Sequence, residues 1–449
     1  MKQNRPRIPE ARRRRRSRIR LPGAPRPGRR TALAATAVLL LSVTAPATSS
    51  RIAASPPAVR APALPGGADG PPSCTLTPGK GVQLSEGIPT GPGHSASTGT
   101  VHALTLMIDF PDVRGEGPAR DRFAEFFPRT ARWFARSSYG RLDYRPATPV
   151  ERWLRMPRAF RSYGLERGSP FEPGYRRLVR DIVRVADPHV DFARYDLVNV
   201  LITPNAGPPA AETVLSVTFA GNAEAPSADG VRLANVSFIY SRQDDGTGSF
   251  AANGYRVLPH ENGHAFGLPD LYTADGGHKV GHWDVMSEDW GPGNDLLAWH
   301  KWKLGWLTGR QVRCVARPGD TAYTLRPLAR RGGGTKLVFV PVSASGGYTV
   351  EVRTNEGNDE GVCRPGVLIS WVDARVDSGQ GPVTVMDSTP GSRGCTTEPN
   401  VHPGLSDATF TAGESLHDAR NGIRITVADR LPDGGHRVRV SRRASGAAR

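Results

Sequence analysis

The segment HENGHAFGLPDLY, residues 260–272, constrains this chain more than any other part of it. His260 and His264 are four residues apart, so on a helix both imidazoles project from one face and can reach the same Zn²⁺. Glu261 follows the first histidine, where its carboxylate can take a proton from a zinc-activated water. An ordinary amphipathic helix with surface or core histidines is the alternative, but it gives no reason for the residues that follow.

The residues after His264 predict where the helix ends and which side chain completes the site. Gly267 can adopt the left-handed conformation that ends a helix, and Pro269 prevents its continuation. The chain can then turn back and bring Asp270 toward the metal as a third ligand. A fourth position remains for water or a substrate carbonyl, as catalytic zinc requires.

The N-terminal 47 residues have the pattern of an export signal. Thirteen Lys or Arg and one acid lie in residues 1–30, so this segment carries most of the formal net charge of +17. An apolar stretch at 32–43 and a small-residue site at 45–47 follow. About a dozen apolar residues are too few for a stable membrane span, which needs about twenty. We therefore expect secretion, by the general or the twin-arginine route, and no nucleic-acid partner.

Export makes the four cysteines candidates for two disulfides. Of the three possible connectivities we favour Cys363 with Cys395, and Cys74 with Cys314. The alternative is that Cys74 donates a thiolate to the metal and keeps a zymogen inactive, but the even number of cysteines favours pairing.

Periodicity predicts an α+β fold. We expect buried strands at 102–109, 197–203 and 231–240, an aromatic-rich helical stretch at 123–134 interrupted at Pro128, and an amphipathic helix at 175–186. After residue 311, β-type runs separated by turn residues predict an antiparallel sandwich-like β domain. These runs lie at 336–342, 348–353, 366–371, 383–386, 423–428 and 436–440.

Several of these segments together resemble a known family. HENGHAFGLPDLY, GHWDVMS (281–287) and AWHKWKLGW (298–306) look like the immune inhibitor A family of secreted bacterial metalloproteases, a metzincin-like group. MIDFPD (107–112) and SSYGRL (137–142) are similar to its opening strand and helix-to-strand turn. YTVEVR (348–353) and GVLISWVD (366–373) resemble its C-terminal β region. The resemblance extends over roughly residues 100–440.

The resemblance implies zinc on His260, His264 and Asp270, with Glu261 as general base. It also implies that Met286 lies in a tight turn that forms a hydrophobic floor beneath the metal. The neighbouring His278 and His282 are interpreted as surface or supporting residues rather than catalytic ones.

Calcium is less well supported by the sequence. The acidic, Gly-containing calcium loop of many family members is absent after residues 192–196. Asp109 and Asp112 could coordinate Ca²⁺, but two acids supply too few of the six to eight oxygens required, so we interpret them as solvated loop acids.

The sequence therefore predicts a secreted zinc endopeptidase, a monomer acting on proteins or peptides without stable membrane insertion. The alternative is a catalytically silent exported zinc-binding protein whose β domain binds a surface or a glycan; the intact Glu261 argues against it. The predicted boundaries are a signal peptide at 1–47, a Pro- and Ala-rich linker or propeptide at 48–94, a catalytic domain at 95–310, a β domain at 311–443 and a tail at 444–449.

Overall fold

A computed structural model of the chain describes residues 59–60, 74–204, 206, 216–240, 254–275, 277–287, 294–397 and 401–443. All of them belong to one compact unit, residues 54–449. The predicted signal peptide and the tail lie outside the described residues. The structure is mixed α and β with several sheets, compatible with the α+β class. Its described α-helices are α1 (Ala119–Ala124), α2 (Arg129–Ser137), α3 (Arg176–Ala186), α5 (Val257–Ala265) and α6 (Ala298–Lys303).

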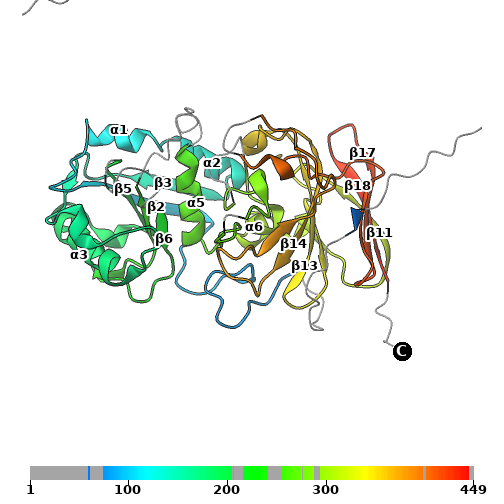
Figure 1. Ribbon diagram of the computed structural model, residues 1–449, viewed down its shortest axis with the longest axis horizontal. Coiled ribbons are helices and arrows are strands. Elements are labelled where there is room, and N and C mark those ends of the chain that lie inside the picture. The colour runs from blue at the N-terminus through cyan, green and yellow to red at the C-terminus, as the bar shows by residue number, and fades with distance from the viewer. Residues whose placement is uncertain are drawn as a thin grey trace, which may run out of the picture. The chain divides into compact units, whose positions relative to one another are not determined.

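A mainly parallel sheet forms the first layer of the fold (Figure 1). All its pairings are parallel except that of β6 with β9, and β6 is its last strand within the described residues. In spatial order the strands are β3 (Leu142–Ala147), β2 (Gly99–Asp109), β5 (Leu197–Ile202), β9 (Val236–Ile239) and β6 (Val217–Phe219), and β4 (Leu154–Arg155) pairs with the end of β2.

Helices cover both faces of this sheet. On one face, α3 packs Leu178 and Ile182 into a cluster with Leu106 of β2. On the other face, α2 and α5 share a second cluster with Met107, the next residue of the same strand. Successive side chains of a strand point to opposite faces, so a strand covered on both sides is apolar throughout, as β2 is over most of its length.

The local predictions agree with these elements, with one difference. The helix predicted at 175–186 is α3, and Pro128 separates α1 from α2. The single strand predicted at 231–240 is instead two, β8 (Val231–Arg232) and β9. An Asp229–Gly230 turn with positive φ at both residues folds β8 back onto β7 (Ser227–Ala228), which takes it away from the main sheet.

Two further sheets form the β region, residues 312–442, and the short strand β1 joins one of them from the N-terminal side of the chain. One has the order β10-β12-β13-β14-β15 and the other β1-β16-β17-β18-β11, and they share an apolar core. Within each sheet all pairings are antiparallel except one at the edge. The strands are β1 (Val59–Arg60), β10 (Val312–Cys314), β11 (Gly319–Leu325), β12 (Leu337–Pro341), β13 (Gly346–Arg353), β14 (Gly366–Asp373), β15 (Val383–Val385), β16 (Ser415–Asp418), β17 (Ile423–Arg430) and β18 (His436–Arg442).

The first of these sheets is buried on both faces. Val338 and Val350 face the second sheet, whereas Phe339 and Leu368 join the same cluster as α2 and α5. Every residue of β13 and β14 is buried as a result. The β region therefore shares a core with the helices that carry the HENGH segment.

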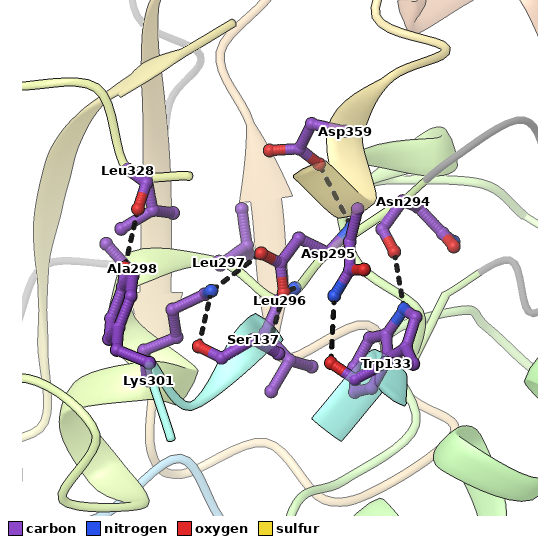
Figure 2. Close-up of polar contacts among 12 residues, drawn as sticks. Trp133, Ser137, Asn294, Asp295, Leu296, Leu297, Ala298, Lys301, Leu328 and Asp359 are labelled. Carbon is purple, nitrogen blue, oxygen red and sulfur yellow. Dashed lines mark hydrogen bonds and ion pairs between the residues drawn. The ribbon is translucent and has the colours of Figure 1, made fainter. Parts of the chain in front are cut away.

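Buried charges also cross this junction (Figure 2). Lys301 of α6 donates to Asp295 at 2.6 Å and to the backbone carbonyl of Ser137 at 2.8 Å. The backbone N–H of Asp295 donates to Asp359 of the β region at 3.0 Å. Asp359 in turn accepts from Arg353, which is fully buried. Each charge has an opposite partner, which a buried charge requires.

The structure pairs Cys74 with Cys314 and Cys363 with Cys395, the connectivity favoured from the sequence. Cys74 is therefore not a thiolate available to a metal. No helix among the described residues has both the length and the apolar character needed to cross a bilayer.

Residues 74–98, here called the strap, are fastened to the segment AWHKWKLGW. Side chains of this segment donate to the middle and to both ends of the strap. The contacts are Trp299 Nε1 to the carbonyl of Glu86, His300 Nε2 to the Glu86 carboxylate, Trp302 Nε1 to the carbonyl of Cys74, Lys303 Nζ to that of Gly87 and Trp306 Nε1 to that of Ser97.

Candidate metal centre

Helix α5 carries His260, Glu261 and His264, and all three side chains are buried. The helix ends at Ala265, two residues before Gly267, whose φ is +90° as the predicted left-handed helix end requires. A Cβ at Gly267 would also collide with Thr90 of the strap. Glycine is therefore required here both by backbone conformation and by space.

The chain then turns back, and Asp270 reaches the two histidines. Asp270 Oδ1 lies 3.1 Å from His260 Nε2 and 3.2 Å from His264 Nε2. These three side chains form the one group of potential metal ligands among the described residues, with donor atoms within 4.8 Å of one another. Two imidazole nitrogens and one carboxylate oxygen are a donor set typical of zinc.

The far side of each imidazole is held by a backbone carbonyl. His260 Nδ1 contacts the carbonyl oxygen of Val285 at 2.8 Å, and His264 Nδ1 contacts that of Leu268 at 2.8 Å. A carbonyl only accepts, so each Nδ1 carries a hydrogen, and in the neutral ring Nε2 presents its lone pair. In that state two lone pairs and a carboxylate oxygen face one another, an arrangement that a metal ion between them, or a proton on an Nε2 atom, would stabilise. The residues present therefore fit a bound metal ion.

The electrostatics of the group point the same way. Burial alone would raise the pKa of Asp270, but the charge of His264 and hydrogen bonds from both imidazoles hold it well below its ordinary value. Burial would lower the pKa of His264, but the charge of Asp270 and their hydrogen bond raise it. The carboxylate is thus ionised and stabilises positive charge at this point.

Glu261 lies beside the three donor side chains but is not one of them. Thr218 of β6 donates to its Oε2 at 2.7 Å. Burial raises the pKa of Glu261, and the two neighbouring histidines and the Thr218 hydrogen bond only partly oppose this effect. A buried carboxylate with a raised pKa next to a metal site has the properties of a general base.

A buried network of amides and hydroxyls fixes the face of α5 that carries Asn262. Its amide donates to Asn199 at 2.8 Å and to Ser237 at 3.1 Å, and its oxygen accepts from Tyr144 at 2.7 Å. Ser237 also lies 2.8 Å from the Thr218 hydroxyl. Because the single Thr218 hydrogen is used on Glu261, Ser237 donates in that pair. The network thus connects α5 and its carboxylate to strands β3, β5, β9 and β6.

Met286, which the resemblance places in a turn under the metal, packs against α5. It is fully buried, and a Cβ on Gly263 inside the HENGH segment would lie too close to its sulfur unless the side chain moved. The Asp284 carboxylate accepts from the Met286 N–H at 2.8 Å, and the Met286 carbonyl accepts from Leu271 N–H at 3.0 Å. The turn is therefore hydrogen-bonded to the residue next to Asp270.

The other candidate residues lie apart from this group. His282 is buried against Trp283, and burial lowers its pKa to about 4. His278 stacks on His402. Asp109 is not the solvated loop acid expected from the sequence, because it is buried at the end of β2 and accepts from Arg155. Asp112 is exposed and accepts from the backbone N–H of Phe160.

The sequence did not identify Thr218, the Asn262 network or Ser378, which binds Asp270 from the β region. Asn262 carried a weak signal, because an amide inside a buried motif needs partners. Thr218 and Ser378 carried none, since only folding brings them to α5.

Comparison with known proteins adds no relative: no family model matches the chain, and no curated protein is significantly similar to it.

Proposed function

We propose that this protein is a secreted zinc-dependent endopeptidase of the immune inhibitor A type. The observation that carries the proposal is the buried Glu261 carboxylate beside three convergent donors that fit Zn²⁺. His260, His264 and Asp270 would suffice to hold a metal ion without Glu261. A base at this point is needed only for chemistry on a molecule bound beside the metal.

In this proposal His260, His264 and Asp270 hold the metal. Bound Zn²⁺ supplies a Lewis acid that polarises the substrate carbonyl and makes water more acidic. Glu261 takes the proton from the attacking water and delivers it to the leaving amine, and its raised pKa suits both transfers. Thr218 holds Oε2, which orients the carboxylate and leaves Oε1 for the proton.

The edge strand β6 gives a place for the substrate. Within the described residues β6 pairs only with β9, so its other edge presents unpaired backbone groups. An extended peptide can add to such an edge as a further strand. Thr218 lies on β6 and contacts Glu261, so a peptide bound there would pass the base.

The test uses the full chain purified after export, and measures metal content and cleavage of a quenched peptide. We expect one zinc per chain and hydrolysis that a chelator stops. Glu261→Gln should retain the zinc and lose at least about 100-fold in kcat, because the base is removed and the ligands stay. Glu166→Gln, which changes an exposed glutamate, is the matched control and should cleave as wild type.

Two results would contradict the proposal. A Glu261→Gln protein with wild-type activity would remove the base from the mechanism. A wild-type protein that binds zinc but cleaves no peptide would favour the alternative, a zinc-containing binding protein.

A further inference from the structure

Ser378 of the β region is hydrogen-bonded to both ends of Asp270. Its hydroxyl oxygen accepts from the Asp270 backbone N–H at 2.8 Å, and its hydroxyl hydrogen is donated to Asp270 Oδ2 at 2.9 Å. The next residue, Gly379, donates to the Asp270 carbonyl at 3.3 Å and accepts from Ala274 N–H at 3.0 Å. Residues 377–380, here called the Ser378 loop, thus form a short ladder with the segment that carries the third candidate ligand.

This contact fixes which oxygen of Asp270 faces the histidines. Asp270 lies in a loop after the end of α5, so no regular structure holds its side chain. Ser378 holds Oδ2, and Oδ1 is the oxygen that lies near both Nε2 atoms. A hydroxyl is neutral, so it orients the carboxylate without cancelling the negative charge that a metal ion needs.

The Ser378 loop is itself fastened to the strap. The two carboxylate oxygens of Asp377 accept from the backbone N–H groups of Gln83 at 3.1 Å and Leu84 at 3.0 Å. The Ser85 hydroxyl of the strap also donates to the carbonyl of Ala374, three residues before the loop, at 2.6 Å. The Cys74–Cys314 disulfide closes the far end of the strap onto β10.

We propose that Ser378 is a positioning residue for the metal centre, and that the β region and the strap complete this centre rather than only adjoin it. The inference rests on the proposed zinc site. It adds that Asp270 binds the metal in the correct geometry only when the Ser378 loop is clamped between Asp270 and the strap. Hydrogen-bond partners of metal ligands typically contribute about 10- to 100-fold to metal affinity.

The experiment measures zinc affinity, by competition with a chromophoric chelator, and the visible spectrum of the Co²⁺-substituted full chain. Ser378→Ala should weaken zinc binding by about 10- to 100-fold and change the Co²⁺ spectrum, because the carboxylate loses its orientation. Ser378→Thr retains the hydroxyl and should restore most of the affinity. Asp377→Asn, which loosens the loop without touching Asp270, should cause a smaller loss in the same direction.

Ser392→Ala is the matched control, because Ser392 donates to Asp407 at 2.9 Å elsewhere in the β region. It should change neither the affinity nor the spectrum. Wild-type zinc affinity and an unchanged spectrum in both Ser378→Ala and Asp377→Asn would overturn this inference and leave the proposed function standing. A wild-type chain that binds no zinc would overturn both.

Discussion

Replacing His300 by glutamine removes a buried positive charge from between the strap and the turn that contains Met286. His300 is fully buried between two acids, with Nε2 2.9 Å from Glu86 of the strap and Nδ1 2.7 Å from Asp284. Burial alone would lower the pKa of His300, but Asp284 and Glu86 outweigh it and raise the pKa to about 10. Asp284 also holds the turn that contains Met286.

The size of the effect follows from linkage between protonation and folding. The ordinary pKa of histidine is 6.5, and each unit of difference between the folded and unfolded pKa corresponds to about 1.36 kcal/mol. The charged His300 therefore stabilises the fold by up to about 5 kcal/mol. Because the folded pKa is raised, this stabilisation is fully present below pH 6.5 and is lost as the pH rises through about 10. His300→Gln leaves two buried carboxylates without a counter-charge and should destabilise by about 3–5 kcal/mol at pH 6.

Urea unfolding, monitored by tryptophan fluorescence at pH 6, 8 and 10, measures the difference in unfolding free energy between wild type and His300→Gln. We expect the difference in unfolding free energy to shrink steadily with rising pH and to be small at pH 10 and above. The control is His102→Gln. His102 is about half exposed beside Asp196, so this substitution should change the unfolding free energy by less than about 0.5 kcal/mol. A large difference that does not change with pH would refute the reasoning, because it would mean that His300 is neutral in the folded protein.

Two further substitutions test the buried polar contacts around the site. Asn262→Ala should lower the unfolding free energy by about 3 kcal/mol, because Tyr144 loses its acceptor and the Asn199 side-chain oxygen loses its donor. Chemical denaturation measures this change. An effect below about 1 kcal/mol would show that water replaces the lost amide. Arg353→Met should destabilise by about 3–5 kcal/mol in thermal unfolding, because the buried Glu351 and Asp359 lose their cation and its hydrogen bonds. A neutral outcome would contradict the view that Arg353 is needed to stabilise these two buried acids.

The sequence by itself determined the local part of the site. The spacing of His260 and His264 places both on one face of α5, and Gly267 has the left-handed conformation predicted for the helix end. The amphipathic α3 and six strands of the β region, β12 to β15, β17 and β18, follow from local patterns in the same way, whereas β10, β11 and β16 were not predicted. These features depend on residues within a few positions of one another, so a linear pattern suffices to predict them.

Only the tertiary structure decided what surrounds those residues. Ser378 reaches Asp270 across 108 positions, and Asp377 reaches Gln83 across 294. Residues 74–94 of the strap lie in the stretch predicted as a linker or propeptide. Their partners include two tryptophans of α6, Trp299 and Trp302, which are more than 200 positions away in the sequence. Contacts at such separations are set by how sheets and helices pack, and packing leaves no pattern in the order of the residues along the chain.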